Sequence, residues 1–365
     1  MREILAIGVI SGTSADGIDA AALLTDGVQV TRTLGGVTVP YAEDLRAEVL
    51  SLMAAPERVR NADLTKVESA ITAAHVAAVE HLIAVLELSF ADIGVVGFHG
   101  QTVLHRPADG FSRQLFDGAA AARRLGLPVV ADFRAADMAA GGEGAPLAPI
   151  SHAARAAGGV RPMAVLNLGG IGNLTWLGAD ERLVAFDTGP ANALLDDWVR
   201  AAGRGDFDRD GALARAGRVD TAVLRRLMAD PYFTRPPPKS LDRYDIAPAG
   251  LYADLSPADG AATLTAFSAA AVAHALAQVP QPPDRLWVCG GGRRNPALMA
   301  AIAAAAGVTA APVEDLGWDG DLLEAELFGF LAVRRLAGLA ITFPETTGVA
   351  APTMGGVVFD LASVG

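Results

Sequence analysis

Three segments of the chain combine glycine with side chains that can hold a phosphate group or a metal ion. The first reads Ser11-Gly12-Thr13-Ser14-Ala15-Asp16-Gly17-Ile18-Asp19 and stands between two apolar runs. Its glycines let a ligand approach the backbone, its hydroxyls can donate hydrogen bonds, and Asp16 and Asp19 can orient a hydrated Mg²⁺ ion. We expect a nucleotide-phosphate loop over this whole segment, although these residues alone are equally typical of a polar hairpin turn.

The other two glycine-rich segments each follow an apolar run that is typical of a strand. One reads Gly169-Gly170-Ile171-Gly172-Asn173, and the other reads Gly290-Gly291-Gly292 with Asn295 shortly after it. Turns of this kind gather at the carboxyl ends of strands, where open α/β sheets bind ligands. A flexible connection from strand to helix is the alternative. The first segment lacks the Gly-x-Gly-x-x-Gly spacing of a dinucleotide site.

Asp187 is the acid best placed to act as a general base. It follows the apolar run 183–186 and precedes Thr188-Gly189-Pro190, so it is expected at a strand end close to the start of a helix. A turn or N-cap aspartate is the structural alternative. An aspartic protease would need a second carboxylate from a matching turn, and the chain has no second apolar run that leads into Asp-Thr-Gly or Asp-Ser-Gly.

Strands and helices alternate along the chain, which predicts a mixed α/β protein. Strands are expected at 4–10, 20–24, 28–34, 93–99, 128–131, 164–168, 174–177, 183–186 and 285–288, with a short one at the end of 346–359. Helices are expected at 42–55, 64–86, 118–125, 191–201, 264–278, 296–305 and 322–339, with His75 and His81 on a helix surface. The second half repeats the opening of the first: strand, glycine-rich turn, strand, acid. Such a repeat indicates two related lobes.

Composition restricts the class of protein. With 365 residues, 52% of them apolar, the chain exceeds the usual size of a single core, and two lobes are expected. A net charge of −12 argues against a nucleic-acid-binding face. No run is apolar and long enough for a membrane span, and the chain starts without a secretory leader. We expect a cytoplasmic protein, which agrees with the single Cys289, and we see no zinc-ligand spacing among the histidines.

The motifs taken together resemble one family. The segments that carry the resemblance are Ser11 to Asp19, Gly97-Phe98-His99-Gly100-Gln101-Thr102, Ala131-Asp132-Phe133-Arg134, Gly141-Gly142-Glu143-Gly144-Ala145-Pro146-Leu147, Leu166-Asn167-Leu168-Gly169-Gly170-Ile171-Gly172-Asn173, Phe186-Asp187-Thr188-Gly189-Pro190-Ala191-Asn192 and Cys289-Gly290-Gly291-Gly292. In this order and spacing the chain resembles the anhydro-N-acetylmuramic acid kinase family nearly from end to end.

The resemblance implies both a fold and an activity. The fold is that of the actin, sugar kinase and Hsp70 group, in which two duplicated ribonuclease H-like α/β lobes surround an ATP cleft. The first lobe would comprise 1–134 plus about 340–365, and the second would comprise 135–339. The activity is ATP-dependent phosphorylation of 1,6-anhydro-N-acetylmuramic acid, with water opening the anhydro ring, to give N-acetylmuramic acid 6-phosphate during recycling of bacterial cell-wall fragments. A homodimer is also implied.

The resemblance assigns roles to individual residues. Asp187 would activate the attacking water, and Gly169, Gly170, Gly172 and Asn173 would form a second phosphate loop. Gly290, Gly291, Gly292 and Asn295 would lie against the adenosine of ATP, with Mg²⁺ held through water. Arg134 suits the planar lactyl carboxylate, and His99, Gln101 and Glu324 would complete the sugar site. Taken alone, Arg134 is typical of a structural ion pair and Glu324 of an exposed helix face.

Two segments depart from the family pattern. Glu143 stands where the family usually has glutamine, and Lys239-Ser240-Leu241-Asp242-Arg243-Tyr244 stands where it has Lys-Ser-Thr-Gly-Arg-Glu. Both departures concern contacts to the sugar, so a related sugar or acid kinase with another acceptor stays open. A non-catalytic ATP-binding switch is the alternative from a different class; its ATP turnover would be slow and unaffected by any sugar.

Overall fold

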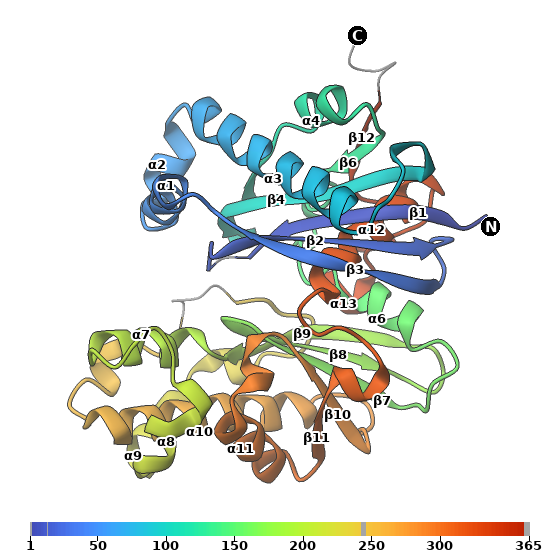
Figure 1. Cartoon of the computed structure of the whole chain (residues 1–365). Helices are drawn as coiled ribbons and strands as arrows, with labels where there is room; N and C mark the ends of the chain where they lie inside the picture. The colour runs from blue at the N-terminus through green and yellow to red at the C-terminus, as the bar shows by residue number, and fades with distance from the viewer. Residues whose placement is uncertain (1, 13, 242–245, 361–365) are drawn as a thin grey trace. The chain divides into compact units, whose positions relative to one another are not determined.

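The computed structural model describes residues 2–12, 14–241 and 246–360, and it divides into two compact units. Unit 1 comprises Met1–Ala157 and Leu322–Gly365, and unit 2 comprises Gly158–Asp321. Each unit has one sheet with helices around it, so the mixed α/β class is confirmed (Figure 1). The sequence placed the boundaries at 134 and near 340 instead. The difference arises because two helices outside the expected first lobe, α6 and α12, contact strands of unit 1.

Unit 1 is built on a sheet in the order β12-β6-β4-β1-β2-β3, with β5 paired to β4. Its strands are β1 (Ile4–Ser11), β2 (Gly17–Thr25), β3 (Val30–Pro40), β4 (Ile93–Arg106), β5 (Phe111–Leu115), β6 (Val129–Ala131) and β12 (Val357–Phe359). Its helices are α1 (Glu43–Met53), α2 (Pro56–Asn61), α3 (Thr65–Val85), α4 (Gly118–Leu125), α5 (Ala135–Ala139), α6 (Pro149–Arg155), α12 (Leu323–Leu336) and α13 (Pro344–Thr347).

Unit 2 has a sheet in the order β11-β10-β7-β8-β9. Its strands are β7 (Met163–Leu168), β8 (Ile171–Leu177), β9 (Leu183–Pro190), β10 (Arg285–Cys289) and β11 (Thr309–Pro312). Its helices are α7 (Ala193–Ala201), α8 (Ala212–Ala216), α9 (Thr221–Met228), α10 (Pro257–Leu276) and α11 (Pro296–Ala306). Apolar residues of α10 and α11 pack with the strands in one core, whose members include Val272, Leu298 and Val288.

The two sheets share one topology. In unit 1, β1, β2 and β3 form an antiparallel meander, β4 pairs parallel with β1, and β6 pairs parallel with β4. In unit 2, β7, β8 and β9 form the same meander, β10 pairs parallel with β7, and β11 pairs parallel with β10. The expected duplication of a ribonuclease H-like lobe is therefore confirmed by strand order and direction.

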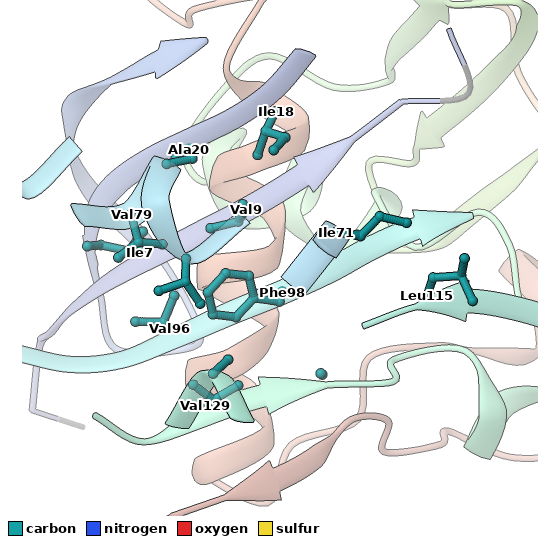
Figure 2. Close-up of a cluster of buried hydrophobic side chains, with 14 of the residues drawn as sticks. Ile7, Val9, Ile18, Ala20, Ile71, Val79, Val96, Phe98, Leu115 and Val129 are labelled. Carbon is teal, nitrogen blue, oxygen red and sulfur yellow. The ribbon is translucent and has the colours of Figure 1, made fainter. Parts of the chain in front are cut away.

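Apolar residues alternate between the two faces of the unit 1 sheet, as expected when both faces are covered. Ile7 and Val9 of β1 belong to a cluster with Ile71 and Val79 of α3, and Figure 2 shows these side chains together. The alternate β1 residues, such as Ala6, belong to a second cluster around α12. The sheet of unit 1 thus forms the middle layer between α3 and α12.

Two strand glycines explain how closely α12 approaches that sheet. A Cβ added to Gly8 of β1 would lie 1.9 Å from the carbonyl oxygen of Ala325, and one added to Gly97 of β4 would lie 2.0 Å from that of Phe328. Real Cβ atoms do not come so near to a backbone oxygen. The helix backbone therefore rests directly on β1 and β4, which positions its first turn relative to the ends of both strands.

Several segments that were expected as turns are strand in the structure. Strand β2 begins at Gly17, β8 begins at Ile171, and β9 continues through Asp187 to Pro190. The cause is ladder pairing through polar residues and glycine, for example between Asn173 and Asp187. Among the described residues no helix is long and apolar enough to cross a membrane.

The expectation for His75 was wrong. Its ring is fully buried between Tyr41 and Phe116, and its Nδ1 donates to the carbonyl oxygen of Ile71 at 2.9 Å. Burial lowers the pKa of His75 to about 4. This histidine is a neutral core residue, whereas His81 is exposed as expected.

Candidate active site

The first glycine-rich segment connects β1 to β2 through a tight turn. The Ala15 N–H donates to the carbonyl oxygen of Gly12 at 3.1 Å, and Ala15 has a φ of 49°, in the left-handed region. Ser11 Oγ donates to the carbonyl oxygen of Gly17 at 2.8 Å and closes the base of the turn. A Cβ on Gly12 would meet only Ser14 Oγ, at 3.7 Å, so the Gly12 backbone is open to a ligand. The expected contact at Thr13 lies outside the described residues.

The two acids of this segment are each oriented by a hydroxyl group. Ser14 Oγ donates to Asp16 Oδ1 at 2.8 Å, and Thr38 Oγ1 of β3 donates to Asp19 Oδ1 at 2.6 Å. Ile18, between them, points into the core. Among the described residues, no group of three or more His, Cys, Asp or Glu side chains could hold a metal ion directly. Oxygen ligands from Asp16 and Asp19 fit an Mg²⁺ ion that keeps most of its water.

Gln101 is buried and holds the turn from the side of β4. Its Nε2 donates to the carbonyl oxygen of Gly12 at 3.2 Å, and its Oε1 accepts from Tyr41 OH at 3.1 Å. Burial raises the pKa of Tyr41 to about 12, so its hydroxyl remains a donor. Arg46 Nε adds a bond to the carbonyl oxygen of Ala15 at 2.9 Å. Sequence reasoning assigned Gln101 to the sugar and missed Tyr41 and Arg46, which carry no local motif.

His99 and Arg134 form one unit. His99 Nδ1 donates to the carbonyl oxygen of Gly100 at 3.0 Å, which leaves Nε2 as the acceptor of bonds from Arg134 Nε at 3.1 Å and Nη2 at 2.9 Å. Burial and the positive charge of Arg134 hold the pKa of His99 well below its ordinary value. His99 is therefore neutral and acts as a support that orients the Arg134 guanidinium.

The glycine-rich segment around Glu143 is held by Asp137, a residue that sequence reasoning missed. Asp137 is fully buried; its Oδ2 accepts from the Gly144 N–H at 2.6 Å and its Oδ1 accepts from Thr347 Oγ1 at 2.6 Å. Arg134 Nη1 donates to the carbonyl oxygen of Gly144 at 2.6 Å. The segment is thus tied both to Asp137 and to the His99–Arg134 unit. The sequence feature that could have drawn attention to Asp137 is that it is a single acid within an alanine-rich stretch.

The first turn of α12 carries two acids in different surroundings. Glu324 is exposed, as expected for a residue that meets a ligand or solvent. Glu326 is fully buried, and its Oε2 pairs with Arg155 Nη2 of α6 at 2.5 Å. The ring centroid of Phe328, one helical turn after Glu324, lies 4.7 Å from that of His99. The helix therefore presents Glu324 in the same unit as His99 and Arg134.

Asp187 lies on β9 and is held by its backbone and its side chain. Its N–H donates to the carbonyl oxygen of Lys239 at 2.9 Å, and its carbonyl oxygen accepts from Tyr232 OH at 2.6 Å. Its carboxylate Oδ2 accepts from the Leu241 N–H at 2.9 Å, and the side chain is almost fully buried. Asn173 of β8 is its neighbour across the ladder. A buried, oriented carboxylate of this kind is suited to accept a proton from a bound water.

The Gly169–Gly170 turn lies at the same edge of unit 2. Asn192 Nδ2 donates to the carbonyl oxygens of Leu168 at 2.8 Å and Gly169 at 2.9 Å, and the Ala191 N–H donates to that of Gly170 at 3.0 Å. A Cβ on Gly172 would lie 2.5 Å from Thr188 Oγ1. The carbonyls are drawn toward α7, a geometry suited to presenting amide groups to an anion.

The Gly290–Gly292 turn lies next to the Gly169–Gly170 turn, because β10, which precedes the first, pairs with β7, which precedes the second. A Cβ on Gly290 would lie 2.2 Å from Asn167 Oδ1, whereas one on Gly291 would meet nothing within 4 Å. Arg293 Nη1 donates to the carbonyl oxygen of Gly290 at 3.0 Å and to Asp321 at 2.9 Å. Asn295 is the N-cap of α11, and its Oδ1 accepts from two backbone amides. The open side at Gly291 fits a flat ligand against the backbone.

The structure thus brings the predicted residues together in two sets. Unit 1 brings the β1–β2 turn next to Gln101 of β4, and it brings Arg134, which follows β6, against His99 of β4. Unit 2 assembles Asp187, Asn173 and both glycine-rich turns at one edge of its sheet.

A family model described as anhydro-N-acetylmuramic acid kinase matches residues 4–360. The chain belongs to the anhydro-N-acetylmuramic acid kinase family. The resemblance drawn from the motifs is therefore confirmed.

Family relatives align over almost their full length. The anhydro-N-acetylmuramic acid kinase of Rhizorhabdus wittichii is 51% identical over 98% of this chain and 99% of that protein. The one of Rhodospirillum rubrum is 51% identical over 99% of this chain and 96% of that protein. Among solved structures, component A of the Acidaminococcus fermentans (R)-2-hydroxyglutaryl-CoA dehydratase matches 92% of this chain and 99% of that one at 11% identity, with a TM-score of 0.48.

Proposed function

We propose that the protein is an ATP-dependent kinase that converts 1,6-anhydro-N-acetylmuramic acid to N-acetylmuramic acid 6-phosphate, with water opening the anhydro ring. The observation that carries the proposal is the match of residues 4–360 to the family, together with relatives that are about half identical over nearly the whole chain. The buried, oriented carboxylate of Asp187 supports a reaction that needs a base.

Asp187 takes the proton of the water that attacks C1 of the sugar. The new bond joins the water oxygen to C1, and the C1–O6 bond breaks. Negative charge then builds up on O6, as on the leaving oxygen of a glycosidase substrate. O6 then bonds to the γ-phosphorus of ATP while the bond from that phosphorus to the β,γ-bridging oxygen breaks, and ADP leaves. The Leu241 N–H, bonded to Asp187 Oδ2, stabilises the ionised carboxylate before the transfer and sets its direction.

Each sheet has a backbone turn at a related position that is suited to bind phosphate. The β1–β2 turn offers the open backbone at Gly12 and the hydroxyl of Ser14, and the β7–β8 turn offers Gly169 and Gly170. Asp16 and Asp19 orient Mg²⁺ through water. The open side of Gly291 takes the adenosine. Because ATP is a nucleotide of the cytoplasm, the same proposal places the protein there.

Arg134 binds the lactyl carboxylate of the sugar. Its guanidinium is oriented by a neutral histidine and a backbone carbonyl, so its positive charge is directed without being cancelled by these two partners. Arg–carboxylate pairs gain from such fixed planar geometry. Glu324, the exposed residue of the first turn of α12, adds a hydrogen bond to the sugar.

The test is incubation with ATP, Mg²⁺ and the anhydro sugar in ¹⁸O-labelled water, followed by mass spectrometry. We expect a product that gains phosphate plus one labelled water, with the label at C1. A product that gains phosphate alone would contradict ring opening. Transfer to a different sugar in a small panel, with none to the anhydro sugar, would support a related kinase whose acceptor pocket is changed by Glu143 and the segment after Lys239. Slow ATP turnover that no sugar accelerates would support a non-catalytic switch.

A further inference from the structure

Lys239 is a buried lysine in the segment 231–241, which follows α9. Its side chain is 2% exposed. Buried lysines are rare because an ammonium group loses its hydration, and they persist where several oxygen atoms replace the water. The surroundings of Lys239 supply those atoms.

The ammonium group of Lys239 lies in a cage made by its own segment. Its Nζ donates to the carbonyl oxygens of Tyr232 at 3.2 Å, Phe233 at 3.4 Å and Arg235 at 3.0 Å. The same Nζ lies 4.8 Å from the ring centroid of Tyr232 and 5.7 Å from that of Phe186, within the range of cation–π attraction. Lys239 thus ties the end of the segment back to its beginning.

The segment that Lys239 closes is also the one that holds Asp187. Tyr232 OH donates to the Asp187 carbonyl oxygen, the Asp187 N–H donates to the Lys239 carbonyl oxygen, and the Leu241 N–H donates to the Asp187 carboxylate. One of these groups lies at the start of the loop that Lys239 closes, and the other two lie at its end. If the loop opened, the three hydrogen bonds to Asp187 could not all be kept at once.

The beginning of the loop is also attached to α10 and to the residues that directly follow this helix. The carbonyl oxygen of Phe233 accepts from His274 Nε2 at 2.7 Å and from Gln278 Nε2 at 2.9 Å. These bonds attach the beginning of the loop to a long helix of the unit 2 core. The Lys239 side chain links this anchored beginning to the end of the loop, where the Leu241 N–H donates to Asp187.

The choice of lysine is itself informative. Of the 29 basic Lys and Arg residues, only Lys66 and Lys239 are lysines. A compact ammonium has three donors that can point to three converging carbonyls, whereas a planar guanidinium cannot enter such a cage without opening it. A chain that otherwise uses arginine almost throughout has lysine at the position where only lysine fits.

We propose that Lys239 is a positioning residue for Asp187: it closes the 231–241 segment into a loop that holds the carboxylate at the angle needed for water activation. The inference rests on the proposed function. It assigns no contact between Lys239 and the substrate, and it predicts that turnover depends on Lys239 while ATP binding does not.

The first test compares Lys239→Met, which keeps the chain length and the contact with the rings, with Lys66→Met on the exposed face of α3. Misplacing a catalytic group by about 1 Å costs about 10²-fold in rate. We expect kcat to fall by about that factor in Lys239→Met, with the KM for ATP within about threefold of wild type, and no change in Lys66→Met. Lys239→Arg should be nearly as slow as Lys239→Met. Wild-type kcat in Lys239→Met would overturn the inference.

The second test needs no turnover. Lysine-selective ¹³C labelling gives two Cε resonances, and Lys66→Met assigns them. Burial, with the charge of Arg235, lowers the pKa of Lys239 to about 8, so its resonance should titrate near that pH, below the ordinary pKa of a lysine. A Lys239 resonance that titrates at the ordinary pKa of a lysine would contradict the burial of its ammonium group among these carbonyl oxygens, even if Lys239→Met fails to fold. The two failures can be told apart. If the wild-type protein is inactive, the proposed function is contradicted. If the wild type is active, Asp187→Asn is inactive and Lys239→Met is fully active, only the inference about Lys239 is overturned.

Discussion

The two units use the same meander of strands but place their key acid on different strands. In unit 1, Asp19 lies on the second strand of the meander and accepts from the Thr38 hydroxyl on the third. In unit 2, Asp187 lies on the third strand, opposite Asn173 on the second, and accepts from a backbone amide. The shared topology sets where an acid can stand, and the local partners determine what it can do. Asp19 is half-buried and its carboxylate accepts from a hydroxyl, whereas Asp187 is almost fully buried and its carboxylate is held ionised and in a fixed direction by a backbone amide.

The largest expected effect tests that contrast directly. Asp187→Asn keeps the shape and an acceptor for the Leu241 N–H but removes the proposed base, so kcat should fall by about 10³-fold with the ATP dissociation constant unchanged. Asp19→Asn should lower kcat by on the order of tenfold and raise the Mg²⁺ concentration needed for half-maximal rate, because the proposed role of Asp19 is only to orient a hydrated ion. Steady-state kinetics and ATP titration measure both. Equal losses in the two variants would break the comparison.

A second difference concerns how a helix meets each sheet. In unit 1, α12 rests on the backbone at Gly8, whereas in unit 2 the paired strands β7 and β10 carry Leu166 and Val288 in register. Gly8→Ala would force a methyl group to within 1.9 Å of a helix carbonyl and should cost about 3 kcal/mol of unfolding free energy. Gly250→Ala in unit 2, where a Cβ meets nothing within 4 Å, is the control. Denaturant unfolding measures both, and an unchanged midpoint for Gly8→Ala would show that α12 can shift.

Much of this architecture could be predicted from the sequence, since apolar runs and glycine-rich turns mark the strands and the order of the meander. The prediction failed where hydrogen bonding between distant segments decides. Gly17, Ile171 and Asp187 read as turn residues, yet the neighbouring strands extend the ladder through them. The bond between Gln101 and Tyr41, which are 60 residues apart, also has no local signal in the sequence, whereas the contact of Gln101 with the sugar stays a prediction. Contacts between residues far apart in the chain leave no local pattern.

Buried histidines distinguish unit 1 from unit 2 in their response to acid. His75, His99, His105 and His152 all lie in unit 1, and burial is the first cause that lowers the pKa of each. Each is neutral in the fold, so the unfolded chain binds more protons below its ordinary pKa, and unfolding free energy falls as pH falls. Unit 1 should therefore lose its structure at a higher pH than unit 2.

His75→Phe isolates one of these groups. The pKa of His75 moves from 6.5 to about 4, so between these pH values its contribution to the unfolding free energy falls by about 3 kcal/mol. Phenylalanine keeps an aromatic ring beside Tyr41 and Phe116 and does not titrate. The variant should match wild type near neutral pH and exceed it in stability at pH 4, as measured by denaturant unfolding across that range. Parallel pH profiles for the two proteins would mean that His75 is not buried as described.

The smallest expected effect separates structure from ligand contact within the Gly290–Gly292 turn. Gly290→Ala places a Cβ 2.2 Å from Asn167 Oδ1 at a φ of 75°, so it should lower Tm by roughly 5 °C, because such strain costs about 1–3 kcal/mol. Gly291→Ala places its Cβ in open space and should leave Tm unchanged. If an adenosine lies against this backbone, only a bound nucleotide would meet that Cβ, and the KM for ATP should rise in Gly291→Ala without any loss of stability. An unchanged KM for ATP in Gly291→Ala would remove this turn from the proposed nucleotide site. The Gly169–Gly170 turn would then be the only glycine-rich turn of unit 2 that is proposed to bind the nucleotide, as the β1–β2 turn is in unit 1.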